Sequence, residues 1–589
     1  MRNVLCFALL VPVLALAAGT TQPGTAVKSG VSLQPMTALP GDGQAGPASP
    51  PSGSGPTHAA RFTVGIVDTV GGTTYDWCSN GPAFRALTQT PGKGVHAIWM
   101  YSTDMSNTNF PDRNIRYNFY DYGTGTWNWI DADFMQSGVN IYAERAGYGT
   151  IDVDTNGVAV ILAHHATTAG YAPVIARDAD AGAGIFEYAP GEPTLDRNVW
   201  CWLGINMNGY YQLAMIDDVS QDNLQWSRST AWQSYDVAMS IPSPQPEPLF
   251  PAHGIATSKV SGTNKVSITW VATSASYMQE PGFYRESQDG GTTWDAPVDL
   301  GFPPAFSPGS ETVPSYHLSS LFPWYDMNNN LHIVGSVGPY VRDTNWILPA
   351  EIWHWCPANP DTWNLIRVAS PDSFNASAGY NAMVASRPSI GADGAGNLFV
   401  AWEEFDGVNV EQTTSRLRAD IWYSSSTDNG VTWDEGTKLT DGGNVSYRFP
   451  SILNPIGDTI MVTYIVDQTA GFFVQGEGPA TNNPIVVQKF VSSGIEGPKV
   501  VPPGRMAVAA SPSPANDRTA ISYSVPRSGD VSLVIYDAAG RPVKTLASGH
   551  REAGRYTAMW DAGEAAAGVY FYTLTSGKAA VTRKLILAD

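Results

Sequence analysis

The feature that most constrains this sequence is an eight-residue turn that occurs twice. Residues 287–294 are Ser-Gln-Asp-Gly-Gly-Thr-Thr-Trp, and residues 426–433 are Ser-Thr-Asp-Asn-Gly-Val-Thr-Trp. In both copies the Asp can accept hydrogen bonds from turn amides, the Gly supplies a positive φ, and the Trp can cover neighbouring strands. Each copy therefore predicts a β-hairpin fixed at its tip, and the two copies together predict a repeated fold.

Weaker copies of the turn continue with the same spacing. Trp226, Trp294, Trp363 and Trp433 are separated by 68, 69 and 70 residues, and an Asp lies a few positions before each of them. A further imperfect copy occupies residues 121–127. The alternative for the imperfect copies is that Trp follows short Asp-containing turns by chance. The regular interval favours a repeated sheet module over that alternative.

The octapeptide resembles the Asp-box, or BNR repeat, of sialidases and related β-propellers. The positions that carry the resemblance are Ser287, Asp289, Gly291, Trp294, Ser426, Asp428, Gly430 and Trp433. In that family the box lies on a turn between the outer strands of a blade, away from the active face. The resemblance therefore implies a sialidase-like β-propeller and does not by itself imply a chemistry.

Composition agrees with an all-β protein and excludes one class of partner. Of the 589 residues, 43% are hydrophobic and only 15% are charged, with 58 Gly and 43 Pro. This balance favours short strands and tight turns over long amphipathic helices. The formal net charge of −20 would repel a phosphate backbone, so we expect no nucleic-acid partner.

The chain divides into five predicted segments. Residues 1–18 resemble a secretory signal peptide, residues 19–60 form a polar linker rich in Gly, Pro and Ser, and residues 61–495 form the propeller. A second linker covers 496–514, and a C-terminal domain covers 515–589. The signal predicts an exported bacterial protein that passes through the periplasm. No stretch after the signal is long and apolar enough to predict a membrane span.

Within the propeller, the first predicted strand is 61–67, and we expect it to close the ring by pairing with the last blade. Seven units follow, each with an apolar strand, an Asp/Asn/Gly turn and a second strand. They span 84–133, 143–190, 200–240, 250–300, 313–367, 386–440 and 447–491. This predicts a seven-bladed propeller. Six blades is the alternative, if the second and third units share one blade.

The last part of the chain alternates apolar and polar residues between turns, which predicts a small antiparallel β-sandwich. The segments 534–541, 560–561 and 568–572 resemble the FlgD-type immunoglobulin-like domain and the C-terminal sorting domains of the type IX secretion system. The resemblance implies export to the cell surface or medium, with the outer-membrane secretion machinery as a partner. One departure is that residues 513–516 are Ser-Pro-Ala-Asn where the family has Pro-Asn-Pro.

The sialidase resemblance also implies a set of catalytic residues. In that family three arginines bind a substrate carboxylate, a carboxylic acid protonates the leaving group, and a Tyr activated by a Glu attacks the sugar. Arginines at the start of predicted units are Arg85, Arg387 and Arg448. The alternative is that these arginines are simply solvent contacts at strand ends.

Candidates for the remaining catalytic roles follow from position. The acid is Asp104 or Asp112, in the loop after the first hairpin of the unit that carries Arg85. The candidate nucleophile is Tyr464, the nearest Tyr after Arg448. The glutamate that would activate this Tyr is Glu403 or Glu404.

No cofactor or metal is expected, because the cysteines and histidines lack metal-ligand spacing. Cys78, Cys201 and Cys356 remain after the signal peptide, so at most one disulfide can form, and buried structural cysteines are the favoured interpretation.

Three functions remain open from the sequence. The leading hypothesis is a secreted or surface protein that recognises an extracellular glycan or protein without established catalysis. The alternative is an exo-acting glycoside hydrolase of the sialidase type. A third possibility is a purely structural surface protein, which would have no ligand.

Overall fold

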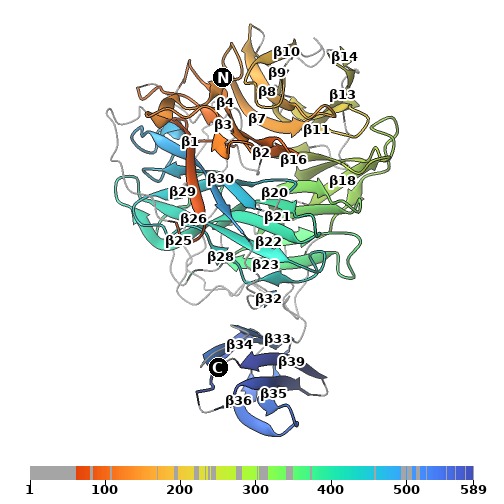
Figure 1. The fold of residues 1–589 in the computed structure, drawn as a ribbon, viewed down its shortest axis with the longest axis vertical. Helices are drawn as coiled ribbons and strands as arrows, with labels where there is room; N and C mark the ends of the chain where they lie inside the picture. The colour runs from red at the N-terminus through yellow and green to blue at the C-terminus, as the bar shows by residue number, and fades with distance from the viewer. Residues whose placement is uncertain are drawn as a thin grey trace, which may run out of the picture.

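The chain folds into a succession of short antiparallel sheets followed by a separate small domain (Figure 1). In this computed structural model, residues 62–587 are described apart from 80–83, 107–108, 169, 191–196, 218–223, 233, 236–238, 241–246, 274–280, 302, 304–315, 340–348, 370, 372–374, 457–458, 492–498, 501–506, 512–517, 526, 552–553, 564 and 578. The predicted signal peptide and first linker lie outside the described residues. The fold is an all-β propeller with a C-terminal β-sandwich, as expected from the sequence.

Among the described residues, the propeller contains seven sheets of four or five strands. The first three sheets contain β2 (Leu87–Thr90), β3 (Gly94–Tyr101), β4 (Asn114–Asp121), β5 (Thr126–Trp127) and β6 (Val139–Asn140); β7 (Ala146–Val153), β8 (Ala159–Thr167), β9 (Gly170–Asp178) and β10 (Phe186–Pro190); and β11 (Asn198–Ile205), β12 (Tyr211–Asp217), β13 (Leu224–Ala231), β14 (Ser234–Tyr235) and β15 (Met239–Ser240). The units predicted at 143–190 and 200–240 thus form separate sheets.

The other four sheets follow in chain order. They contain β16 (Glu247–Thr257), β17 (Val266–Thr273), β18 (Gly282–Ser287) and β19 (Val298–Asp299); β20 (Tyr316–Tyr325), β21 (Leu331–Pro339), β22 (Ala350–Trp355) and β23 (Trp363–Ala369); β24 (Ala385–Ala392), β25 (Leu398–Glu411), β26 (Arg416–Ser426) and β28 (Thr437–Lys438); and β29 (Ser446–Ile452), β30 (Ile460–Asp467), β31 (Asn483–Phe490) and β1 (Ile66–Thr73). Two short 3-10 helices, η1 (Phe134–Gln136) and η4 (Phe473–Gln475), lie between strands. No helix in the described part of the chain is both long and apolar enough to cross a membrane.

The first strand closes the ring, as predicted, because β1 pairs antiparallel with β31 of the last sheet. Its predicted bounds, 61–67, are wrong: the strand runs over Ile66–Thr73. The physical reason is Gly65, whose φ of +72° breaks the extended chain. Before that break, the Thr63 amide donates to the Leu439 carbonyl at 3.0 Å, beside the sixth sheet.

The first strand of most sheets carries the same irregularity near its start. In β7, β11, β24 and β29 the register shifts by a β-bulge, and the bulge contains a non-glycine residue with positive φ. These residues are Tyr148, Trp200, Arg387 and Phe449, with φ between +50° and +57°. A bulge changes the direction of the side chains around it. The first strands of these four sheets therefore share one local departure from regular side-chain alternation.

The two octapeptide turns have the same internal hydrogen bonds. In the first copy, the Gly291 amide donates to Ser287 Oγ at 2.8 Å, and the Thr293 amide donates to Asp289 Oδ1 at 2.8 Å. The second copy repeats both bonds at 2.9 Å, from the amides of Gly430 and Thr432. Each turn connects the third strand of its sheet to the next strand outwards.

Each octapeptide turn also packs on the preceding sheet. Gln212 of the third sheet donates to the Gly290 carbonyl at 3.0 Å, and the rings of Trp226 and Trp294 meet edge to face with centroids 5.2 Å apart. His354 of the fifth sheet contacts the Gly430 carbonyl at 3.2 Å. The turns therefore fasten neighbouring sheets to one another as well as closing their own hairpins.

The C-terminal domain consists of two sheets with a shared core. One sheet contains β33 (Ala507–Ser511), β34 (Arg518–Val525) and β37 (Gly554–Asp561), and the other contains β36 (Pro542–Arg551), β35 (Gly529–Asp537), β38 (Gly568–Ser576) and β39 (Ala579–Leu587). Ile521 and Trp560 from the first sheet pack with Leu533 and Leu574 from the second. Strand β33 lies entirely within the predicted linker 496–514, and its apolar residue Val508 joins this core.

A glycine substitution should separate the contribution of sheet-to-sheet packing from that of backbone strain. A Cβ on Gly291 would lie 2.3 Å from the Trp226 ring, and its φ is +88°. We expect Gly291→Ala to cost about 1 kcal/mol for the positive φ and a further 1–3 kcal/mol, roughly, for overpacking. Urea unfolding of the variant and the unsubstituted protein measures the change in the free energy of unfolding.

The matched control is Gly262→Ala, because Gly262 has φ of +80° and nothing within 4 Å of an added Cβ. It should show the strain cost alone. Equal losses of stability in the two variants would contradict the packing role assigned to the turn.

Candidate functional site

Two of the three predicted arginines meet at one carboxylate. Arg448 lies on β29, and its Nε and Nη2 donate to Glu403 of β25 at 3.0 and 3.2 Å. Arg387, at the bulge of β24, forms an ion pair with the same Glu403 through Nη1 and donates to the Asn381 carbonyl through Nη2 at 2.9 Å. The Phe449 amide adds a bond to Glu403 at 2.9 Å. The seventh sheet is thereby joined to the sixth.

This ion triad is shielded from solvent. The relative exposure is 1% for Arg387, 2% for Arg448 and 0% for Glu403. Burial alone would raise the pKa of Glu403, but the two guanidinium groups outweigh burial and hold the pKa below its usual value. Both arginines are therefore engaged by an internal carboxylate, and a substrate carboxylate would have to displace Glu403 to bind them.

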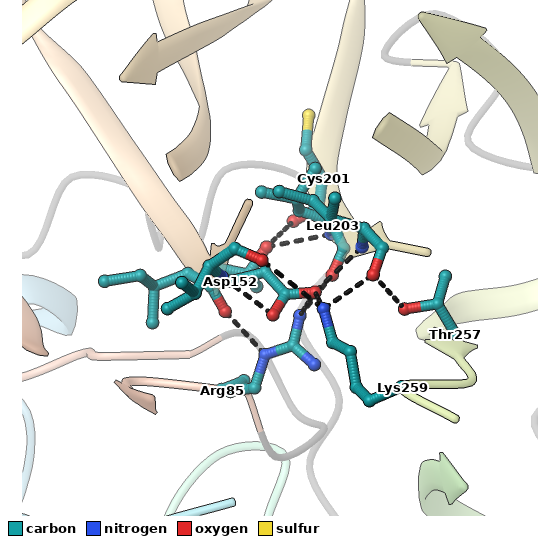
Figure 2. Close-up of polar contacts among 10 residues, drawn as sticks. Arg85, Asp152, Cys201, Leu203, Thr257 and Lys259 are labelled. Atoms are coloured by element: carbon teal, nitrogen blue, oxygen red, sulfur yellow. Dashed lines mark hydrogen bonds and ion pairs between the residues drawn. The ribbon is translucent and has the colours of Figure 1, made fainter. Parts of the chain in front are cut away.

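Arg85 lies in a different cluster, shown in Figure 2. Its Nε donates to the Ile151 carbonyl at 2.5 Å, and its Nη2 lies 3.3 Å from Asp152 Oδ2. Lys259 also binds this oxygen, at 3.0 Å, and donates to the Ile205 carbonyl at 2.6 Å. Arg85 thus joins strands of the second and third sheets, and the structure does not bring it into contact with the other two predicted arginines.

The electrostatics of this channel cluster, defined as Arg85, Asp152 and Lys259, resemble those of the ion triad. Asp152 is 2% exposed, and burial alone would raise its pKa. Arg85 and Lys259 outweigh burial, together with the Ile205 amide, which donates to Asp152 at 2.8 Å, so the pKa of Asp152 is lowered. The cluster therefore keeps an ionised carboxylate between two cations.

The predicted acids are engaged in local turns. Asp104 accepts bonds from the amide and hydroxyl of Ser106 at 2.8 and 2.9 Å. Asp112 accepts bonds from the hydroxyl of Ser102 at 2.5 Å and from the amide of Thr103 at 2.7 Å. Both acids organise the loop between β3 and β4.

The predicted nucleophile is buried away from its predicted partners. Tyr464 is 2% exposed, and its hydroxyl donates to Gln488 Oε1 at 2.6 Å. Burial raises the pKa of this phenol well above its ordinary value. Glu403 is held by the arginines and Glu404 by Arg367 at 2.7 Å, so the structure does not bring Tyr464 together with either glutamate.

A pair of buried acids went unnoticed in the sequence. Asp76 accepts bonds from the amides of Phe473 and Val474 at the start of η4, at 2.5 and 3.2 Å. Burial raises the pKa of Asp76 to about 7, and burial together with the charge of Asp76 raises the pKa of Asp467. No spacing rule links residues so far apart in the chain, so only the fold could have revealed this pair.

A cavity of about 260 Å³ opens beside the sixth sheet. It is lined by residues of β23, β25, β26 and β28 and of the segments next to them. The lining residues are Arg367, Val368, Pro371, Glu404, Phe405, Asp406, Gly407, Asp420, Trp422 and Lys438. We call this cavity the Trp422 pocket.

Stacked planar groups and ion pairs hold the wall of the Trp422 pocket. The indoles of Trp402 and Trp422 stack with centroids 6.4 Å apart, and the Arg367 guanidinium lies 4.3 Å from the Trp422 ring. Arg367 also binds both oxygens of Glu404, at 2.9 and 2.7 Å. Lys438 lies 2.7 Å from Asp420. The available signal in the sequence was the pair of tryptophans on strands of one predicted unit.

The cysteines are free thiols in the structure. Cys78, Cys201 and Cys356 are all buried, in agreement with the structural role expected for them. Burial raises the pKa of each thiol, which disfavours the reactive thiolate. In the described part of the chain, no group of three His, Cys, Asp or Glu side chains is arranged to hold a metal ion.

The C-terminal sandwich matches a known family. Residues 510–588 match the model of the secretion system C-terminal sorting domain. The protein is secreted or displayed at the cell surface. This match covers the sandwich alone and says nothing of the propeller. No curated protein matches the sequence.

Solved structures similar to this chain are propeller-sized but distant. They include the polysaccharide lyase Uly1 (10% identity, TM-score 0.39, covering 71% of this chain and 92% of the lyase) and a protein of unknown function from Dyadobacter fermentans (9%, 0.36, 72% and 99%). A third is an α-L-arabinanase from Penicillium chrysogenum complexed with arabinobiose (11%, 0.34, 60% and 97%). At these identities and TM-scores the similarities carry no argument about chemistry.

Removing the central carboxylate of the ion triad should be costly. Glu403→Gln would leave Arg387 and Arg448 buried without a counter-charge, and we expect a loss of about 3–5 kcal/mol in the free energy of unfolding. The neighbouring variant Glu404→Gln breaks a partly exposed ion pair and should cost about 0–1 kcal/mol. Denaturant unfolding of both variants provides the comparison, and similar losses would show that the triad is not the buried contact described above.

Proposed function

We propose that this protein is exported by its C-terminal sorting domain and that its propeller recognises an extracellular glycan. The family match of residues 510–588 supports export. The observation that carries glycan recognition is the Trp422 pocket, where carboxylates, a guanidinium and an ammonium group surround an indole. The partner during export is the secretion machinery that the sorting domain addresses.

The pocket has the physical properties of a sugar subsite. Sugars present closely spaced hydroxyls, which both donate and accept hydrogen bonds, beside apolar C–H groups. Carboxylate oxygens and cationic N–H groups satisfy the hydroxyls, and aromatic surface suits the C–H groups. A volume of about 260 Å³ is below that of drug-sized sites, so it accommodates a single sugar ring with its neighbours left in solvent.

The polar groups of the pocket are fixed before any ligand arrives. Glu404 is held by Arg367 and accepts a further bond from the Trp402 indole at 3.1 Å. Asp420 accepts bonds from the hydroxyl of Thr440 at 2.8 Å and the amide of Gly442 at 2.6 Å. Pre-organised groups lose little entropy on binding, which favours recognition. Carboxylates already engaged by cations are poor general acids, which favours recognition over proton transfer at this pocket.

The second candidate function is an exo-acting glycoside hydrolase of the sialidase type. It is favoured by one observation, the convergence of Arg387 and Arg448 from neighbouring sheets on Glu403. In this proposal the two arginines would bind a substrate carboxylate once Glu403 is displaced. Arg85, Asp104 and Tyr464 would require rearrangement to join them, so the proposal is weaker than glycan recognition.

A paired assay discriminates between the candidate functions. The mature protein is applied to a glycan array, and in parallel it is incubated with a fluorogenic sialoside. We expect binding to at least one glycan and no release of fluorophore. Turnover that Arg448→Ala abolishes would instead establish the hydrolase, and silence in both assays would indicate a structural surface protein.

Deletion of residues 510–588 should abolish export without unfolding the propeller. Among the described residues, no propeller sheet includes any part of this segment, and the last strand seen to pair with the propeller is β32 (Lys499–Val500). We expect the truncated protein to be retained inside the cell envelope while the full-length protein reaches the surface or medium. Cell fractionation measures the distribution, and unchanged export of the truncated chain would contradict the sorting role.

A further inference from the structure

The Trp422 pocket has an uneven charge balance that bears on its ligand. This inference rests on the proposed function, glycan recognition at the pocket. Among the described residues that line the cavity there are three carboxylates, Glu404, Asp406 and Asp420, and two cations, Arg367 and Lys438. Three negative and two positive charges leave one negative charge uncompensated. The whole chain adds to the same field with its formal charge of −20.

Both cations are already committed to protein carboxylates. Arg367 binds the two oxygens of Glu404 through Nε and Nη2 and directs Nη1 to the Glu435 carbonyl at 3.4 Å. Lys438 lies 2.7 Å from Asp420, which is 2% exposed. An anionic sugar would have to compete with these carboxylates for each cation, and it would also face the surplus negative charge. The pocket therefore disfavours uronates and sulfated sugars.

The surplus charge belongs to Asp406. This residue is half-buried at the pocket wall, and its Oδ1 accepts the Val408 amide at 3.0 Å in a tight turn. Among the described residues, its second oxygen accepts no hydrogen bond and no cation lies within ion-pair distance. The turn fixes the Asp406 carboxylate in place, and its Oδ2 stays available to a ligand that enters the Trp422 pocket.

We infer that the Trp422 pocket selects an amino sugar, a hexosamine unit whose free amine is protonated, and that Asp406 binds the ammonium group. A protonated amine supplies the positive charge that the pocket lacks and donates hydrogen bonds to the open oxygen of Asp406. N-acetylation removes this charge and adds bulk at the same position. The remaining hydroxyls of the ring meet the partly exposed Glu404 carboxylate, which accepts hydrogen bonds, and the partly exposed Lys438 ammonium, which donates them.

The test compares three tetrasaccharides by isothermal titration calorimetry on the mature protein: those of glucosamine, N-acetylglucosamine and galacturonic acid. Measurements at about pH 6 and about 0.15 M salt keep the amine charged and screen long-range attraction to the acidic protein. We expect the glucosamine tetramer to bind about fivefold more tightly than the N-acetylated tetramer, and the galacturonate tetramer to bind most weakly.

Two variants assign the preference to the pocket. Asp406→Asn should reduce glucosamine binding to the level of the N-acetylated tetramer and leave the latter unchanged. Asp441→Asn is the matched control, because it removes one exposed carboxylate outside the pocket from the turn that follows β28. It should retain the preference.

The outcomes separate the two proposals. Equal affinity for the amino and N-acetylated tetramers, or a preference that survives Asp406→Asn, overturns the amino-sugar inference while glycan recognition stands. Failure of all three tetrasaccharides, together with a silent glycan array, overturns glycan recognition itself and the inference with it.

Discussion

The propeller depends on finding hydrogen-bond partners for the backbone groups at the innermost edge of each sheet. In the described part of the propeller, the first strand of each sheet has a neighbouring strand on one side only, so backbone N–H and C=O groups on its other side face the centre of the ring. Hydroxyl side chains of adjacent first strands meet some of these groups. Thr150 accepts the Leu203 amide, Ser389 accepts the Ile452 amide and Ser451 accepts the Ala86 amide, each at 3.0 Å.

The same constraint gives the channel cluster its role. Carbonyl groups on β7 and β11 point inward, and a hydroxyl can satisfy only one at a time. Arg85 and Lys259 donate several hydrogen bonds each to such carbonyls, and Asp152 neutralises part of their charge (Figure 2). The need to satisfy backbone carbonyls that lack a strand partner thus explains the charged cluster, and no substrate has to be invoked.

The sequence was informative where a residue type dictates a local geometry. The octapeptide turns and their glycines with positive φ follow from rules that act over a few residues. The closing strand was expected from the way propellers avoid a free edge, and its bounds were missed. The partners of Arg85, Arg387 and Arg448 follow from no such rule, because spacing assigns a residue to a sheet but not a direction to its side chain. Arg387 and Arg448 lie at bulges and bind Glu403, whereas Arg85 lies beside a regular strand and pairs with Asp152. The Trp422 pocket depends on contacts among four strands, and its only signal in the sequence was the pair of tryptophans in one predicted unit.

The short pairing between β27 (Trp433–Asp434) and β32 has a mechanical consequence. It pairs the chain that leaves the propeller with the segment between β26 and β28, at the end of the second octapeptide turn. When the sorting domain is held by the cell envelope, tension along the chain reaches the propeller first at Trp433. If the Trp422 pocket binds a glycan polymer, as proposed above, a pull on that polymer and a pull on the C-terminal domain would both act on β26 and the strands beside it.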